Sequence, residues 1–329
     1  MTDDQSTVPA NDWILVAGRQ ARDADLTAAL EAAGHRWRPL PAGELDTGAL
    51  SGAIGLIAPP GRPLSLDELA AAPRLRAVVS TVIGTDHLPL DALAERGIPV
   101  AHGAFPENYI GMAEAAVGLV IALVHRIKQK EAALLAGRSP SSVGGLVSGR
   151  TIGLIGLGRI GAAIAERLAP WGCRLVSTSS AAARTPGVDP VTMEELLEVS
   201  DVVSVQVPLN DSTRSLIGAA ELAAMRPGAA LISIGRGGVV DEWALSAALD
   251  SSHLSGAAVD VWETEPPPAD HPLLHRADVI ATGHNVGHSE ESYRRMSSLA
   301  AQQVIALVEG REPTYPLRAR SSRANPPKP

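Results

Sequence analysis

The chain has 329 residues, a length typical of two domains, and 45% of them are hydrophobic, enough to form sizeable cores. Its formal net charge of −8 argues against binding to nucleic acids or anionic membranes, and its one cysteine, Cys173, excludes an internal disulfide. The polar N-terminus is unlike a secretory signal and the longest apolar stretch is shorter than the roughly 20 residues of a membrane span, so we expect a cytoplasmic protein.

Short apolar runs alternate with helical patterns in the first part of the chain. The runs predict strands over 13–18, 53–59, 76–81 and 98–103. The helical patterns between them cover 23–33, 65–72 and 89–97. Strands that alternate with helices are typical of βαβ units, so this part of the chain predicts a parallel, doubly wound α/β domain.

The alternation is clearer after residue 150. The predicted strands cover 151–156, 173–179, 201–208, 230–235, 254–262 and 278–282. The predicted helices cover 160–169, 193–198, 219–224 and 241–250. This second series predicts a second doubly wound domain with a parallel sheet.

Two longer helical patterns, 108–127 and 289–310, stand outside these series and are predicted to connect the domains. The first domain then comprises 1–104 and is rejoined by 289–316, and the second comprises 105–288. Residues 317–329 are basic and proline-rich, and we expect them to form a flexible tail.

Residues 151–168 read TIGLIGLGRIGAAIAERL, an apolar run followed by three glycines and an amphipathic helical pattern. Gly156, Gly158 and Gly161 form the G-x-G-x-x-G pattern of dinucleotide-binding loops. Gly156 would permit the tight turn, Gly158 would let the backbone approach a pyrophosphate, and Gly161 would allow the helix to pack closely on the strand. The alternative is a strand-to-helix turn that binds no ligand.

Charged side chains accompany the ends of three consecutive predicted strands. Arg236 follows 230–235, Asp260 and Glu265 lie at the end of and after 254–262, and His284 follows 278–282. Ligands bind at the carboxyl ends of strands in open α/β sheets. An arginine there suits a carboxylate, because its planar fork donates two parallel hydrogen bonds, and a histidine suits general acid/base chemistry.

Taken alone, each of these residues also fits a structural role. Arg236 fits a surface arginine, Asp260 and Glu265 fit caps or solvated charges, and His284 fits a helix cap. His288 lies four residues after His284, which raises the alternative of a metal pair. The loop-like sequence between them and the lack of a nearby cysteine disfavour this, so we expect no metal.

The motifs GLIGLGRIG, VPLNDSTRSLI, ISIGRGGVVDEWAL, AAVDVWETEPP and TGHNVGHSEE occur in one order and spacing that resembles the D-isomer-specific 2-hydroxyacid dehydrogenase family. VIGTDHLPLDALAERGIPV and NYIGMAE in the first half also match. The resemblance implies two Rossmann-like domains, a substrate domain and a dinucleotide-binding domain, with the active site in the interdomain cleft. It also implies a homodimer, and a small 2-keto or D-2-hydroxy acid as substrate.

The resemblance implies a role for each matched position. Arg236 would bind the substrate carboxylate and polarise the carbonyl, His284 would donate or accept the proton, and Glu265 would orient His284 and favour its protonated form. The backbone of residues 81–84 would bind the carboxylate. The substrate-side residues are Val82, Ile83, Gly84 and Asn108. The expected cofactor-binding residues are Gly156, Gly158, Arg159, Ile160, Gly161, Ser179, Ser180, Arg184, Val207, Pro208, Thr213 and Asp260, of which Asp260 would hold the nicotinamide carboxamide.

Three departures from the family pattern restrict the range of substrates that we expect. Val82 stands where a glycine is common, which narrows the substrate loop. Glu265 stands where formate-oxidising relatives carry glutamine, which disfavours formate. Pro59 stands where relatives that oxidise phosphoglycerate carry arginine, which disfavours phosphoglycerate, although Arg62 is close enough to substitute.

The end of the second strand of the dinucleotide-binding domain favours NADP(H). In the family an acidic residue that binds the adenosine ribose follows the third glycine after 17 intervening residues, and here that position is Ser179. Ser180 follows it, and no acid occurs between Arg167 and Val188. Hydroxyls and Arg184 would suit a 2′-phosphate. The alternative is that Ser179 binds the ribose hydroxyls and that NAD(H) is used as well.

Two further functions remain open at this point. Some relatives act as dinucleotide-sensing corepressors, so the fold alone does not decide between an enzyme and a sensor. Arg236 would equally suit the oxyanion of phosphite or a hydroxyphosphonate as an oxidisable substrate.

Overall fold

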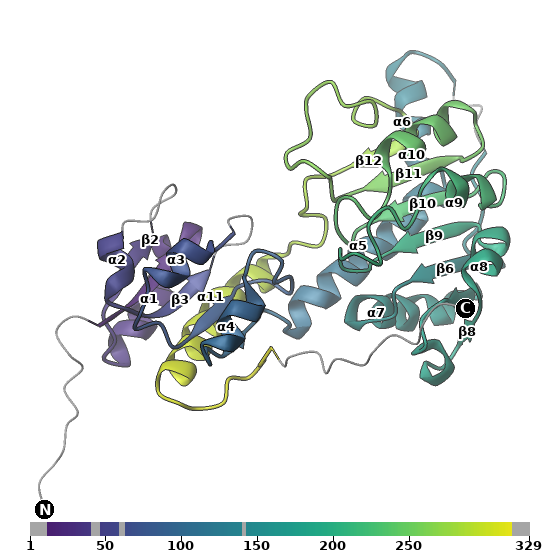
Figure 1. Cartoon of the computed structure of the whole chain (residues 1–329). Helices are drawn as coiled ribbons and strands as arrows, with labels where there is room; N and C mark the ends of the chain where they lie inside the picture. The colour runs from purple at the N-terminus through teal and green to yellow at the C-terminus, as the bar shows by residue number, and fades with distance from the viewer. Residues whose placement is uncertain (1–11, 41–46, 59–62, 140–142, 318–329) are drawn as a thin grey trace, which may run out of the picture. The chain divides into compact units, whose positions relative to one another are not determined.

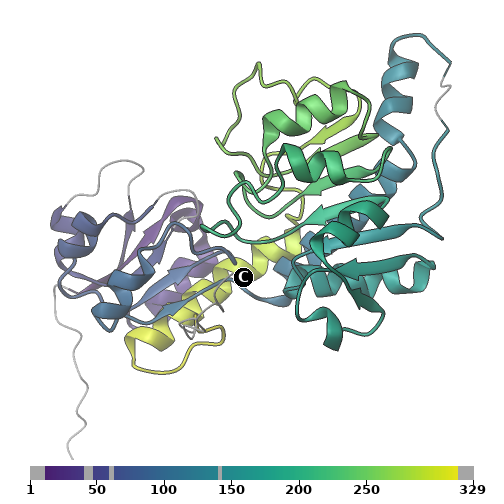
Figure 2. The ribbon, with the colours of Figure 1, turned by 45° about the vertical axis from the view of Figure 1, so that its right-hand side comes forward.

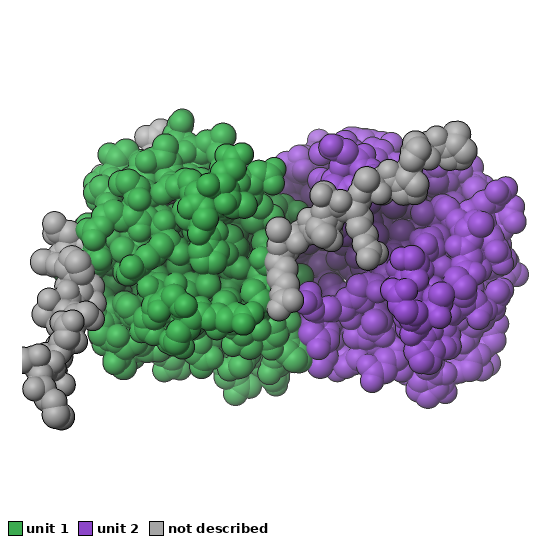
Figure 3. Space-filling view, turned by 60° about the horizontal axis from the view of Figure 1, so that its bottom comes forward, with its two compact units in different colours: residues 1–108, 289–329 green, residues 109–288 purple. Residues whose placement is uncertain are grey.

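The computed structural model describes residues 12–40, 47–58, 63–139 and 143–317, so part of the expected tail, 318–329, and the positions Pro59 and Arg62 lie outside the described residues. The chain forms two compact units, 1–108 with 289–329, and 109–288. Figure 1 labels the elements, and Figure 3 colours the two units separately.

A five-stranded parallel sheet forms the centre of the first unit. Its order is β2-β1-β3-β4-β5, so the chain reverses its direction of travel across the sheet beside β1. The strands are β1 Trp13–Ala17, β2 Trp37–Leu40, β3 Ala53–Ala58, β4 Val78–Ser80 and β5 Val100–Ala101. The helices are η1 Gly18–Arg22, α1 Ala24–Ala32, α2 Thr47–Ser51, α3 Leu66–Ala70, α4 Leu90–Glu95 and α11 Glu290–Val308.

Both faces of this sheet are buried, as expected for a parallel sheet covered by helices. Ile14 and Val16 of β1 point into an apolar cluster with α1 and the C-terminal helix α11. Trp13 and Leu15 point into the opposite cluster, which contains residues of α3 and α4. The long helical pattern near the C-terminus therefore returns the chain to the first sheet, as Figure 1 shows by the yellow helix beside the purple strands.

A seven-stranded parallel sheet forms the centre of the second unit, in the order β12-β11-β10-β9-β6-β7-β8. Its strands are β6 Thr151–Ile155, β7 Arg174–Ser177, β8 Val188–Pro190, β9 Val202–Val205, β10 Ala230–Ser233, β11 Gly256–Val259 and β12 Val279–Ala281. The order reverses between β6 and β9, which is the switch point where doubly wound sheets bind ligands. Two parallel, doubly wound sheets confirm the predicted fold class.

Helices cover both faces of the second sheet as well. The helices from 106 to 250 are α5 Pro106–Val124, α6 Ile127–Leu135, α7 Arg159–Leu168, η2 Ala169–Trp171, η3 Ala182–Arg184, α8 Met193–Val199, α9 Ala219–Ala224 and α10 Glu242–Asp250, of which α6 buries no residue. α5 and α7 pack on Ile152 and Leu154 of β6, whereas α8, α9 and α10 pack on the face that contains Ile155. By length and composition α5 would also be able to cross a membrane, a property it shares with core helices of soluble proteins.

Three details differ from the sequence prediction. The strands β2 and β8 were not predicted. The helical pattern 108–127 is interrupted, because Arg126 adopts a left-handed backbone (φ 54°) between α5 and α6. The first boundary between the units lies at 108/109 rather than 104/105, because α5 begins in the first unit and continues into the second.

The packing of α11 on β3 can be tested at Gly55. A Cβ at this position would lie 2.9 Å from Val304 Cγ2 and 3.1 Å from Val308 Cγ1. Gly55→Val should therefore lower the free energy of unfolding by about 1–3 kcal/mol through overpacking, measured by chemical denaturation. Gly118→Ala on α5, where a Cβ meets nothing within 4 Å, serves as the control and should not destabilise. Equal stability of Gly55→Val and the wild type would contradict this packing.

Candidate active site

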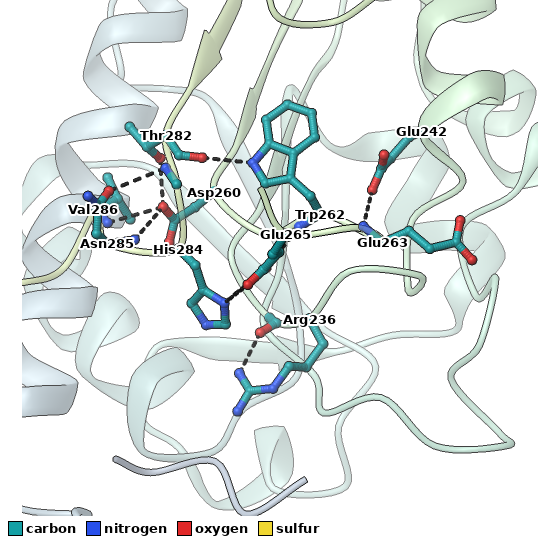
Figure 4. Close-up of polar contacts among 12 residues, drawn as sticks. Arg236, Glu242, Asp260, Trp262, Glu263, Glu265, Thr282, His284, Asn285 and Val286 are labelled. Atoms are coloured by element: carbon teal, nitrogen blue, oxygen red, sulfur yellow. Dashed lines mark hydrogen bonds and ion pairs between the residues drawn. The ribbon is translucent and has the colours of Figure 1, made fainter. Parts of the chain in front are cut away.

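Arg236, Glu265 and His284 extend from three loops that follow β10, β11 and β12 (Figure 4). These strands are neighbours in the sheet and all run parallel, so their carboxyl ends lie side by side at one edge. The sequence separates these residues by 48 positions, and the sheet topology brings them into one part of the second unit.

His284 and Glu265 form a charge-assisted pair. Nδ1 of His284 lies 3.0 Å from Oε1 and 2.9 Å from Oε2 of Glu265. A carboxylate accepts only, so Nδ1 carries the ring proton and Nε2 is left to exchange a proton with a ligand. The two side chains are 42% and 39% exposed, so the pair is accessible to small molecules. Oε1 of Glu265 also accepts the backbone N–H of Trp262 at 3.1 Å, which fixes the carboxylate.

The backbone of His284 is held in a left-handed conformation with φ 55°. Such a conformation costs a non-glycine residue roughly 1–2 kcal/mol. The cost is offset by Asp260: its carbonyl accepts the N–H of His284 at 2.6 Å, and its Oδ1 accepts the N–H groups of Asn285 at 2.9 Å and Val286 at 3.1 Å. Thr282 Oγ1 donates to the same Oδ1 at 2.7 Å.

The other carboxylate oxygen of Asp260 has no such partners. Asp260 is 1% exposed, and its Oδ2 is buried without a hydrogen-bond partner among the described residues. An unpartnered buried acceptor is costly, so a donor from a bound group would be stabilising there. A primary carboxamide such as that of nicotinamide has a suitable N–H.

Arg236 lies in a loop whose path depends on two glycines. A Cβ at Gly235 would lie 2.5 Å from the carbonyl oxygen of Val207, and one at Gly237 would lie 1.9 Å from that of Trp262. Only glycine permits these approaches, so the loops after β9, β10 and β11 pack directly on one another. Arg236 is partly buried and its Nη1 donates to the carbonyl oxygen of Gly235 at 2.8 Å. Figure 4 shows its guanidinium on the same side of the loops as the imidazole of His284.

The glycine-rich loop after β6 has the geometry that the motif predicts. Gly156 has φ +100°, and a Cβ at Gly161 would lie 2.2 Å from the carbonyl oxygen of Gly156, so the start of α7 packs tightly on the turn. A Cβ at Gly158 would meet nothing within 4 Å, which leaves open space beside the helix N-terminus. Arg159 and Ile160 are the first residues of α7, and no side chain caps this helix. Its first N–H groups are therefore available to an anion.

The predicted ribose-side residues lie past the end of β7. Ser179 is partly buried and Ser180 and Arg184 are exposed, the latter in η3. Ser179 Oγ accepts the N–H of Ala181 at 3.2 Å.

The loop after β9 carries the remaining predicted cofactor residues. Thr213 Oγ1 donates to the carbonyl oxygen of Pro208 at 2.6 Å and accepts the N–H of Asn210 at 2.8 Å. These bonds close the loop on itself. Val207 is partly buried, and its Cγ1 would lie 2.8 Å from a Cβ at Gly156. This loop therefore leaves no room for a side chain at position 156.

The predicted substrate-side residues lie in the first unit. Residues 81–84 follow β4, and Ser80 Oγ donates to the carbonyl oxygens of Val82 at 3.1 Å and Gly84 at 3.0 Å. The N–H groups of Ile83 and Gly84 donate to no other described residue. Asn108 Nδ2 donates to the carbonyl oxygen of Gly103 at 3.1 Å, at the start of α5.

Sequence reasoning missed Gln206, which follows β9 and joins the glycine-rich loop to the loop after that strand. Its Nε2 donates to the carbonyl oxygen of Gly156 at 2.6 Å, and its Oε1 accepts from Ser204 Oγ at 2.7 Å. It also missed Trp262, whose indole N–H donates to the carbonyl oxygen of Thr282 at 2.8 Å and so joins the loops that carry Glu265 and His284.

These features fit a nicotinamide dinucleotide in two separate places. The open space at Gly158 and the uncapped α7 suit a pyrophosphate, and Oδ2 of Asp260 suits a carboxamide. Among residues 12–40, 47–58, 63–139 and 143–317, no group of three or more His, Cys, Asp or Glu is arranged to hold a metal ion.

Comparison with known proteins agrees with this geometry. Residues 117–286 match the model of the D-isomer specific 2-hydroxyacid dehydrogenase, NAD binding domain. A glyoxylate reductase from Korarchaeum cryptofilum is 34% identical over 277 residues, which cover 80% of this chain and 82% of that protein. The TT0316 protein from Thermus thermophilus is 31% identical, with a TM-score of 0.81 over 93% of this chain and 99% of that one. A D-lactate dehydrogenase from Aquifex aeolicus, solved with NAD and lactic acid, is 25% identical, with a TM-score of 0.81 over 90% of this chain and 96% of that one. The chain belongs to the D-isomer specific 2-hydroxyacid dehydrogenase family.

Proposed function

We propose that His284 and Glu265 are the acid/base pair, and Arg236 the substrate anchor, of an enzyme that interconverts a small 2-keto acid and its D-2-hydroxy acid. The observation that carries this proposal is the bidentate contact of Nδ1 of His284 with Glu265, which leaves Nε2 for the substrate oxygen. A bound nicotinamide supplies or accepts the hydride.

The remaining chemistry belongs to side chains of this chain. As the carbonyl carbon of a keto acid is reduced, negative charge develops on its oxygen. A protonated His284 would donate a hydrogen bond and then the proton to that oxygen, and Glu265 would stabilise the imidazolium. Arg236 would bind the substrate carboxylate through its planar fork and would add positive charge near the carbonyl. In the direction of oxidation, His284 would accept the proton of the hydroxyl.

The substrate loop 81–84 would contribute backbone donors to the same carboxylate. Ile83 and Gly84 offer N–H groups that no other described residue accepts. Val82 packs against the cluster of Phe105, Met296 and Leu299, so its side chain is directed into the first unit and the loop backbone is left for the ligand. Asn108 would act beside the substrate.

The proposed roles of His284 and Arg236 predict different kinetic defects. His284→Asn keeps a residue that tolerates the left-handed backbone but removes the proton carrier, so turnover should fall by roughly 10²–10⁴-fold. Arg236→Ala should raise KM for the keto acid and also lower kcat. The assay follows nicotinamide absorbance over a panel of 2-keto acids, phosphite and hydroxyphosphonates. Turnover of His284→Asn close to that of the wild type would refute the acid/base assignment, and wild-type inactivity on the whole panel would favour a dinucleotide-sensing role.

We propose NADP(H) as the preferred cofactor. No acidic residue occurs from 168 to 188, and Asp189, the first one after it, holds Arg174 Nε at 3.0 Å. Ser179 Oγ accepts from the backbone and makes no other hydrogen bond to a described residue, so its hydroxyl hydrogen is available to a phosphate. The exposed Arg184, on the turn that follows, would supply positive charge for the 2′-phosphate.

The cofactor preference can be tested by restoring the acid. Ser179→Asp should repel a 2′-phosphate and accept the ribose hydroxyls, so kcat/KM should fall with NADPH and rise with NADH. Ser179→Asn, which is similar in size and uncharged, is the control that separates charge from shape. A wild-type enzyme that clearly prefers NADH would contradict the proposal.

We also propose a cytoplasmic homodimer that forms through a surface segment made of α6 and residues 143–147. None of the nine residues of α6 is buried, although a helix this short is marginal in water without packing. Lys128 donates to the carbonyl oxygen of Val279 in β12, and Gln129 donates to that of Ser255 just before β11. Beyond these contacts α6 runs past the margin of the second sheet (Figures 1 and 2). The exposed apolar side chains of this segment are Ile127, Leu134, Leu135, Val143 and Leu146.

A charge on this segment should dissociate the dimer. Leu134→Glu combined with Leu135→Glu should halve the mass measured by light scattering after gel filtration, because both side chains would be buried between copies. Leu66→Glu on α3, a leucine of similar exposure in the first unit, is the matched control and should leave the mass unchanged. A monomeric wild type would rule the dimer out.

A further inference from the structure

We propose that Glu242 is a positioning residue for the acid/base pair, and that it acts by clamping the segment that carries Glu265. This inference rests on the proposed roles of His284 and Glu265 and adds a residue that touches neither substrate nor cofactor. Glu242 is the first residue of α10, directly after the helix cap Asp241.

Glu242 holds the backbone next to Glu265. Its Oε1 accepts the N–H of Glu263 at 2.6 Å, and Figure 4 shows this bond reaching from α10 to the loop after β11. The side chain of Glu242 is only 10% exposed, whereas Glu263 lies at the surface, so the bond joins a largely buried carboxylate to an exposed part of the turn. A charge-assisted bond of this length is short and directional, and its loss would free the N–H of Glu263, and with it the turn, to move towards water.

The bond from Glu242 to Glu263 is adjacent in the chain to the bond that orients Glu265. Glu263 lies between Trp262, whose N–H donates to Oε1 of Glu265, and Glu265 itself. Glu242 therefore holds one peptide group of a turn whose neighbouring peptide group orients the carboxylate. The indole N–H of Trp262 holds the carbonyl oxygen of Thr282, two residues before His284. Displacement of this turn would move both members of the pair relative to each other.

His271 also packs against this turn, next to Glu242. Its ring packs edge-to-face on Trp262 with centroids 5.2 Å apart, and it is 7% exposed. Nδ1 of His271 accepts the N–H of Leu273 at 3.3 Å, so Nε2 carries the proton. Nε2 lies 3.0 Å from Oε2 of Glu242, a close polar contact whose angle is outside hydrogen-bond geometry. Both oxygens of Glu242 are thus directed at the segment 263–271.

The position of Glu242 also connects the Arg236 loop to this turn. The loop after β10 runs from Arg236 through Gly237, which touches the Trp262 carbonyl, to the start of α10. Only five residues separate Arg236 from Glu242, and the segment 237–242 contacts 262–263 at both of its ends. The clamp therefore fixes the anchor and the acid/base pair relative to each other within the second unit.

The test compares Glu242→Ala with Glu242→Gln. The alanine variant removes the acceptor of the Glu263 N–H, so kcat should fall roughly 10- to 100-fold, as expected for a small displacement of a catalytic group, while KM for the keto acid and the Kd of the cofactor stay close to wild type. The glutamine variant keeps a carbonyl acceptor and should restore most of kcat. Glu221→Ala is the matched control, because Glu221 accepts the Gly218 N–H at 3.0 Å in the first turn of α9 and should leave kcat unchanged.

A double-mutant cycle separates positioning from general destabilisation. If Glu242 acts through Glu265, Glu242→Ala combined with Glu265→Gln should be about as active as Glu265→Gln alone. Multiplicative losses would overturn the proposal, and so would a Glu242→Ala variant with wild-type kcat while His284→Asn is inactive. That last result would leave the proposed function standing.

A readout without turnover keeps the inference testable even if no substrate is found. The ring ¹⁵N shifts of His284, assigned against His284→Asn, should move in Glu242→Ala towards those of Glu265→Gln, because the contact of Nδ1 with the carboxylate is weakened. Unchanged His284 shifts in Glu242→Ala would overturn the proposal, since the clamp would then have no effect on the pair.

Discussion

The buried carboxylate of Asp260 is the constraint on which the candidate site depends. Its Oδ1 accepts one hydroxyl and two backbone N–H groups from residues 282–286, and its own carbonyl accepts the N–H of His284. These bonds offset the conformational cost of the left-handed backbone at His284, and without them the turn would relax to another conformation. Oδ2 has no hydrogen-bond donor among the described residues, so one side chain both shapes the turn at His284 and leaves an acceptor for a ligand.

The parallel sheet of the second unit explains how three residues far apart in the sequence form one candidate site. Adjacent strands β10, β11 and β12 end at one edge, so three separate loops deliver an arginine, a carboxylate and an imidazole to one place. The loops are then locked together by backbone contacts at Gly235 and Gly237 and by the indole N–H of Trp262. The family to which the chain belongs transfers a hydride between a nicotinamide and a 2-hydroxy acid, and these locked loops present groups suited to that chemistry.

Local patterns in the sequence predict the buried strands and the glycine-rich loop, because central parallel strands are continuous apolar runs and the glycine roles depend on immediate neighbours. The two strands that were missed, β2 and β8, lie at the edges of their sheets, and each contains a proline, Pro39 or Pro190. Edge strands tolerate proline and need no apolar alternation, so they lack the signal.

Contacts between distant residues were equally invisible in the sequence. Gln206 reaches a carbonyl 50 positions away, and Glu242 reaches an N–H 21 positions away. Neither residue stands out among the polar side chains near it, since only the folded sheet brings the partners together. The break between α5 and α6 also lacked a signal, because Arg126 is an ordinary helix former that here adopts φ 54°.

The left-handed backbone at His284 restricts how this position can change during evolution. β-Branched side chains are sterically excluded from that conformation, whereas asparagine, aspartate and glycine tolerate it. Asparagine and glycine would preserve the turn and its bonds to Asp260 but would not carry a proton. If His284 carries the proton as proposed, one such substitution would abolish catalysis and keep the fold, and one reverse substitution would restore the activity. With the proposed role of His284, a single substitution in this turn would separate an enzyme from a non-catalytic binding protein.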